Sequence, residues 1–170
     1  MTAFHKTYFD ILETIDDCVS KDRITPALIL LYSAIDSFSD LSNRKEKGGR
    51  QTFKDWVKTY MLEKYPLPCN EEDIYAARCA LLHTNTSESD LSKKSEAMEL
   101  YYVHGQKPIE PLEQAIQNVQ ETQGRVIAVR VEDMIRSFRN GMADCMALIG
   151  SDPKWTSEFN SKVEKYLTVV

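Results

Sequence analysis

Apolar residues recur at spacings of three and four along most of this chain, and this period limits the fold more than any other feature. The stretch from Phe4 to Val19 has one such stripe, and so have Pro26–Leu41, Thr52–Tyr65 and Val131–Ile149. An α-helix places residues at these spacings on one face, so each of these stretches predicts an amphipathic helix packed by that face. A further helix, apolar on most sides, is predicted from Asn70 to about Thr84. A last helix, capped by Ser151 or Asp152, is predicted to run to about Leu167.

The breaks between these stretches carry the usual signals of helix ends. Gly48 and Gly49 predict a loop at 42–50, and Pro66 with Pro68 ends the third helix. Asn70 precedes three acidic residues and therefore predicts a helix start, because asparagine caps free amides and acidic side chains complement the positive end of the helix dipole.

The character of the chain changes between about residues 88 and 130. Ala97–Val103 and Arg125–Val131 are short β-prone runs, and Pro111–Glu121 between them can form a short helix. The two strands would pair either as a hairpin or across that helix. The fold expected for residues 1–170 is therefore mainly α: a single helical-bundle domain with a small two-stranded β appendage inserted at about 88–130.

Composition narrows the functional classes. With 170 residues, of which 42% are hydrophobic and 28% charged, the chain can bury a sufficient core without a metal or a disulfide. The longest apolar run, Ile24–Ile35, is shorter than the ~20 residues of a membrane span, and His5 and Lys6 stand where a signal peptide would turn apolar. We expect a cytoplasmic protein with no membrane contact. Its net charge of −5 weighs against a broad nucleic-acid surface.

The most unusual segment is the helix that starts after Asn70. Arg78 is the only charged residue between Ile74 and Leu82, so this helix is expected to be buried on most sides, with Arg78 in the middle of its bulkiest apolar arc. A buried charge needs a partner. The candidates are Asp36 or Asp40 of the second helix, a cluster of carbonyls, or a second subunit.

His83 follows Arg78 by five residues, which on a continuous helix is a rotation of about 140° and a rise of about 7.5 Å. One helix alone therefore does not aim both side chains at one atom, but two copies related by a two-fold axis can surround a shared cleft. At the helix end, the carbonyl dipoles favour an imidazole that exchanges protons near neutral pH.

The run from Arg78 to His83 resembles the Arg-x4-His signature of HEPN domains, which are small, typically dimeric helical bundles. The resemblance implies metal-independent RNA cleavage at a homodimer cleft. Arg78 would neutralise the scissile phosphate, and His83 would move the proton of the 2′-hydroxyl. Many members of this family are toxins or defence nucleases, some paired with nucleotidyltransferase-like antitoxin proteins. Others have lost catalysis and serve as dimerisation or partner-binding modules, which is the alternative for this chain.

Further candidates surround this motif. Thr84 and Asn85 follow His83 and are candidate substrate contacts, while the basic residues of the loop, Arg44, Lys45, Lys47 and Arg50, form either a phosphate track or an ordinary solvated loop. Cys79 and His83 could share zinc with Cys69 or His104, but their spacing is irregular for a zinc site. We therefore expect no metal and no cofactor. The four cysteines are expected to be reduced thiols, because no two of them form a CxxC pair.

Overall fold

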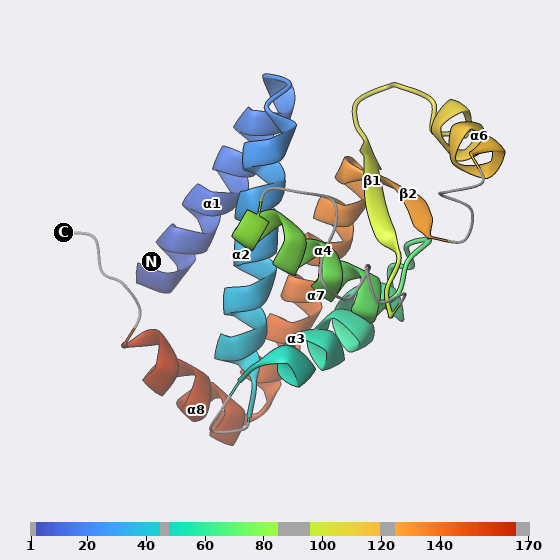
Figure 1. Ribbon diagram of the computed structural model, residues 1–170. Helices are drawn as coiled ribbons and strands as arrows, with labels where there is room; N and C mark the ends of the chain where they lie inside the picture. The colour runs from blue at the N-terminus through green and yellow to red at the C-terminus, as the bar shows by residue number, and fades with distance from the viewer. Residues whose placement is uncertain (1–2, 45–47, 85–95, 120–124, 166–170) are drawn as a thin grey trace.

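The computed structural model is mainly α-helical with one small two-stranded sheet, as the sequence predicts (Figure 1). It describes residues 3–44, 48–84, 96–119 and 125–165. In chain order the elements are α1 (Ala3–Ser20), α2 (Ile24–Ser42), α3 (Arg50–Trp56), the π-helical segment η1 (Val57–Leu62), α4 (Glu71–Thr84), β1 (Glu99–Val103), α6 (Glu110–Asn118), β2 (Val126–Arg130), α7 (Val131–Ser151) and α8 (Pro153–Val163).

Helix α2 is the centre of the core. It contacts α1, α3, α4, α7 and α8, and its residues Leu31, Tyr32, Ile35 and Phe38 are fully buried. The ring of Phe38 lies edge-on to Trp56, with ring centroids 5.5 Å apart, and Trp56 in turn packs on Phe138 of α7. These aromatic contacts join α2, α3 and α7 around one apolar interior.

The length and mean hydropathy of α2 are also those of a membrane span. This is the one described helix of which that is true, and half of it is buried inside the fold. Burial against five neighbouring helices accounts for its apolar residues as a core helix.

The helix predicted for Thr52–Tyr65 is α-helical only in its first half. From Val57 to Leu62 the backbone is a π-helix, so the prediction of one continuous α-helix is wrong there. Apolar side chains still line one side of this segment, with Val57 and Met61 buried. A periodic pattern therefore does not reveal the wider turn. Gly141 of α7 packs directly against the carbonyl of Tyr60 in this segment.

The two strands pair in parallel, from Glu99 opposite Val126 to Val103 opposite Arg130. Parallel strands need a crossover connection, and α6 lies within it (Figure 1). Of the two pairings considered, the hairpin is wrong and the pairing across the helix is confirmed. The second strand ends at Arg130 because the chain enters α7 directly at Val131.

The ends of α8 and α6 differ from the expected positions. Helix α8 begins at Pro153, where Asp152 caps it by accepting hydrogen bonds from the amides of Lys154 and Trp155, and it ends at Val163. The expected end near Leu167 lies outside the described residues. Helix α6 ends at Asn118, before the predicted Glu121, which also lies outside them.

Candidate active site

A capping box fixes the start of α4. The Asn70 side chain accepts hydrogen bonds from the amides of Glu72 and Asp73, at 2.9 and 3.0 Å, and the Asp73 carboxylate accepts one from the amide of Asn70 at 2.9 Å. The second oxygen of Asp73 accepts a hydrogen bond from the amide of Met98 at 2.7 Å. Asp73 is 1% exposed. Its bond to Met98 joins α4 to the segment just before β1, and its charge complements the helix dipole.

Arg78 projects from α4 toward α2. Its Nη2 donates a hydrogen bond to Oδ2 of Asp36 at 2.6 Å, and the two side chains are 19% and 39% exposed. Burial by itself lowers the pKa of Arg78, but the bond and charge of Asp36 outweigh it and raise that pKa above its ordinary value. Of the two carboxylates that the sequence offered, Asp36 is therefore the partner.

The surroundings of Arg78 differ from those expected. Its face of α4 lines an open pocket of about 440 Å³, so Arg78 does not lie in the middle of a buried apolar arc. The reason is that Leu82 and Tyr75, its neighbours on this face, are only partly buried and share the same opening. No residue within Ile74–Leu82 is exposed, so this helix is covered on most sides, as expected. The elements that cover it belong to the same chain.

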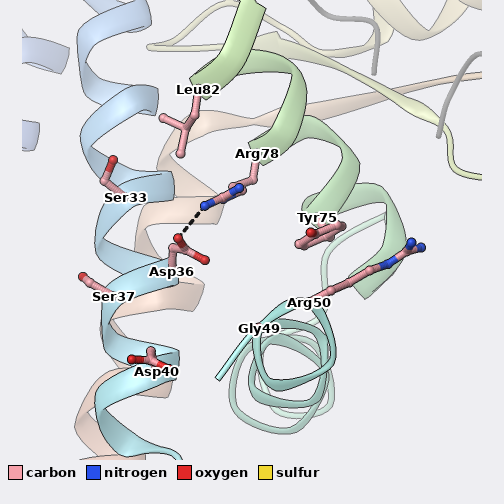
Figure 2. Close-up of a pocket in the computed structure, with 9 residues that line it drawn as sticks. All are labelled: Ser33, Asp36, Ser37, Asp40, Gly49, Arg50, Tyr75, Arg78 and Leu82. Atoms are coloured by element: carbon pink, nitrogen blue, oxygen red, sulfur yellow. Dashed lines mark hydrogen bonds and ion pairs between the residues drawn. The ribbon is translucent and has the colours of Figure 1, made fainter. Parts of the chain in front are cut away.

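Three elements line the pocket (Figure 2). One wall is a polar stripe of α2, which consists of Ser33, Asp36, Ser37 and Asp40. The opposite wall is formed by Tyr75, Arg78 and Leu82 of α4. Gly49 and Arg50, at the start of α3, close one end. The two carboxylates and two guanidinium groups balance one another in formal charge.

Arg50, which lines this pocket, already forms two contacts within the protein. Its guanidinium is paired with Glu72 and lies over the ring of Tyr75, 5.3 Å from the ring centroid. Lys54 also binds Glu72, at 2.8 Å. Burial alone would raise the pKa of Glu72, but the hydrogen bonds from Lys54 and Arg50 lower it below its ordinary value. The ring of Tyr75 is thus held between Arg50 and the edge-on ring of Phe53.

Arg44, which the sequence groups with Arg50 in one basic loop, lies elsewhere. Its guanidinium is 3.1 Å from Asp152 and lies over the Trp155 ring, at 5.4 Å from the centroid, so it packs against the start of α8. Lys45 and Lys47 lie outside the described residues. The structure therefore brings Arg50 together with Arg78 and separates both from Arg44, which lines a different pocket.

His83 occupies the last turn of α4, five residues beyond Arg78 on a continuous helix, as expected. The side chains of His83 and Thr84, and the whole of Asn85, lie outside the described part of the chain. Their contacts with Arg78 or with a substrate stay predictions.

The pocket as a unit was not predicted from the sequence. Ser33, Asp36, Ser37 and Asp40 recur at helical spacing on the face of α2 opposite its core stripe, which is typical of a solvated face. The signal that could have distinguished them is Arg78, because a charge in an apolar helix has to face a polar stripe on its neighbour. Tyr75 gave no signal, since an aromatic residue at helical spacing is ordinarily part of the core.

Other predicted groups lie apart from this pocket. Nε2 of His104 is 3.1 Å from Asp22, and Cys69 is buried, which raises the pKa of its thiol to about 12. In the described ranges, no group of three or more His, Cys, Asp or Glu side chains is placed to hold a metal ion. The four cysteines are free thiols, two buried and two partly exposed.

Comparisons with protein-family models, with curated proteins and with solved structures give no match to this chain. What points to a function in this chain is therefore the Arg-x4-His motif and the geometry around Arg78.

Proposed function

We propose that this protein is a HEPN-like, metal-independent endoribonuclease of the toxin or defence type. The observation that carries the proposal is the place of Arg78. This residue begins the Arg-x4-His motif, and it lies in the wall of an open pocket with its guanidinium oriented by Asp36 at 2.6 Å. A catalytic cation needs such access to solvent and such a fixed orientation.

The motif supplies the two groups that cleavage by an RNA 2′-hydroxyl requires. The 2′-oxygen attacks the adjacent phosphorus, its proton passes to His83, and the bond to the 5′-oxygen breaks, so that the products are a 2′,3′-cyclic phosphate and a 5′-hydroxyl. The 5′-oxygen takes up a proton from water as it leaves. Arg78 compensates the charge that develops on the phosphate oxygens.

The active form in this proposal is a homodimer. Because α4 is a continuous α-helix from Glu71 to Thr84, Arg78 and His83 differ by about 140° around its axis, and a two-fold axis beside the helix would bring both residue types to one cleft. The apolar surface of α4 gives no further support to a dimer, since α2, α3 and β1 of the same chain already pack against this helix.

One observation favours a second candidate, a HEPN-like module without catalysis that dimerises or binds a partner protein such as an antitoxin. Arg78 is already neutralised by Asp36 in the single chain. An arginine that serves only to join two helices would be found in the same ion pair. The first candidate cleaves RNA and the second does not.

The test is cleavage of a panel of single-stranded RNAs by the purified protein in EDTA. We expect cleavage to proceed, and Arg78→Ala and His83→Ala each to lower its rate by about 10²- to 10⁴-fold, the usual weight of a positioned catalytic group. Arg136→Ala is the matched control, because Arg136 is 66% exposed on α7 and pairs only with the nearby Asp133 among the described residues.

Two outcomes would contradict the proposal. Activity that disappears in EDTA and returns with magnesium would show a different chemistry. Absence of cleavage by folded, dimeric wild-type protein on the whole panel would favour the binding module. A 2′-deoxy substitution at the scissile position should abolish cleavage by the wild type, since the nucleophile is then missing.

A further inference from the structure

We propose that the pocket between α2, α3 and α4 binds a guanosine nucleotide, with Asp40 as the residue that selects the base. The inference deepens the proposed function and rests on it, since it names the nucleotide that a ribonuclease would hold beside the scissile phosphate.

Asp40 lies toward the end of the pocket that Gly49 and Arg50 close, and Arg78 lies further along, beside Asp36 (Figure 2). Asp40 lies one helical turn after Asp36 on the same wall of α2, about 6 Å further along the helix axis (Figure 2). Asp36 holds Arg78 at 2.6 Å. An anion at Arg78 and hydrogen-bond donors at Asp40 would thus occupy different places along the pocket, as the phosphate and the base of one nucleotide do.

The backbone at Gly48 lies close to the Asp40 carboxylate. A Cβ atom at Gly48 would overlap Oδ1 of Asp40, so a larger residue at position 48 would make this carboxylate turn away. The next residue, Gly49, has φ = 136°, a conformation that other residues rarely adopt, and it lines the pocket. The exposed side chain of Asp40 is thus accessible to a ligand and lies beside Gly48.

The opposite wall offers a surface on which a base can stack. The Arg50 guanidinium lies over the Tyr75 ring, 5.3 Å from its centroid, and the Arg50 side chain is 45% exposed, so a base entering the pocket would meet this guanidinium. Unpaired bases stack on tyrosine rings and on guanidinium planes, and such stacking accepts any base. Tyr75 and Arg50 therefore supply affinity without selection, and selection is left to the polar wall.

Guanine is the base that suits a carboxylate. A carboxylate only accepts hydrogen bonds, and it can accept two in parallel. Guanine presents two neighbouring donors on one edge, N1–H and the 2-amino group. Adenine and cytosine present an amino group beside a ring acceptor, and uracil presents one N–H between two carbonyl oxygens that a carboxylate repels. The balanced charge of the pocket also fits a ligand with donors at one end and an anion at the other.

Binding is measured by calorimetry with the 3′-monophosphates of guanosine, adenosine, cytidine and uridine. We expect the guanosine nucleotide to bind at least about tenfold more tightly than the others, the usual weight of a two-point base contact. Asp40→Asn should remove this preference, because its amide presents a donor to one of the guanine donors. Asp10→Asn removes the same charge from the exposed face of α1 and should leave the preference intact.

A second variant tests the geometry with the charge retained. Gly48→Ala keeps Asp40 but forces its carboxylate to turn away, so it should also abolish the preference for guanosine. Equal affinity for all four nucleotides, or a guanosine preference that survives in both Asp40→Asn and Gly48→Ala, would overturn the inference.

Mapping of cleavage sites separates this inference from the proposed function. Cleavage next to guanosine in wild type, and at all four nucleotides in Asp40→Asn, would support both. RNA cleavage without base preference in wild type would leave the ribonuclease standing and overturn the guanosine subsite. Tight, selective binding of the guanosine nucleotide without cleavage of any RNA would support the subsite and count against the nuclease.

Discussion

The ion pair between Arg78 and Asp36 lies at the centre of the candidate site. How far its side chains are exposed determines how much the pair stabilises the fold. The Asp36 side chain is 39% exposed and lines an open pocket, so solvent screens the pair. We expect Asp36→Asn to lower the free energy of unfolding by about 1 kcal/mol, well below the 3–5 kcal/mol typical of breaking a fully buried pair. Urea unfolding at neutral pH measures this difference.

The same variant also addresses the role of Arg78. If Asp36 orients Arg78 for catalysis, Asp36→Asn should lower the cleavage rate while the fold persists. A loss of stability near that of a buried pair, with unchanged cleavage, would show that the pair serves the core and not the pocket.

Glu72 gives the fold a dependence on pH that has a definite sign. Lys54 and Arg50 hold the pKa of Glu72 below the ordinary value of 4.5, so its stabilising effect is present above that pH and is lost as the pH falls through the lowered pKa. We expect Glu72→Gln to be less stable than wild type at pH 7 and equally stable once wild-type Glu72 is protonated, well below pH 4.5. Chemical unfolding at several pH values compares the two proteins.

The control for this experiment is Glu13→Gln, a change on the exposed face of α1. Its stability difference from wild type should be small at every pH. A difference for Glu72→Gln that persists in acid would mean that Glu72 contributes through packing and not through its charge.

Most helices were predictable from the sequence, because the signals that predict a helix, its apolar spacing and its caps, lie within the helix itself or next to it. The apolar spacing from Phe4 to Val19 and the capping sequence after Asn70 predict α1 and α4 closely. The hydrogen bond from the Met98 amide to Asp73 was not predictable, since it joins residues 25 apart in the sequence and an acidic first turn already explains Asp73. The π-helical turn was also missed, because its apolar residues keep the spacing of an ordinary helix. Its Tyr60 carbonyl lies in close contact with Gly141 of α7.

That contact can be tested with two glycines of the same helix. A Cβ at Gly141 would lie 2.6 Å from the carbonyl oxygen of Tyr60, a backbone atom that cannot rotate away. We expect Gly141→Ala to destabilise the protein by about 1–3 kcal/mol, as overpacking commonly does. Gly150 lies in α7 with nothing within 4 Å of its Cβ position, so Gly150→Ala should be neutral or slightly stabilising. Thermal and urea unfolding of the two variants check the contrast, and equal effects would contradict it.

At the scale of the whole molecule, the sequence offered two pairings for the strands and could not choose between them. The choice depends on the connection through α6 and on contacts far apart in the chain. Arg130, at the end of β2, donates hydrogen bonds to the carbonyls of Gly105 and Lys107, which follow β1. These bonds join the ends of both strands at the same edge of the sheet, as a parallel pair requires. The pocket was hidden for the same reason, since its walls come from three elements.

The proposed catalysis depends on a property of the whole molecule, the proposed dimer. Arg78 and His83 lie on one helix about 140° apart, so a cleft that needs both would take them from two subunits related by a two-fold axis. We expect light scattering at micromolar concentration to give about twice the 19.5 kDa of one chain.

The shared cleft also predicts that two inactive variants can restore each other. In a mixed dimer of Arg78→Ala with His83→Ala, the shared cleft keeps one Arg78 and one His83 from opposite subunits, so one of its two arginine–histidine pairs is intact. Random exchange of subunits should then return roughly a quarter of wild-type cleavage. Each variant alone should stay inactive and dimeric. A mass near 19.5 kDa, or a dimer that mixing does not reactivate, would mean that Arg78 and His83 do not act across a subunit interface.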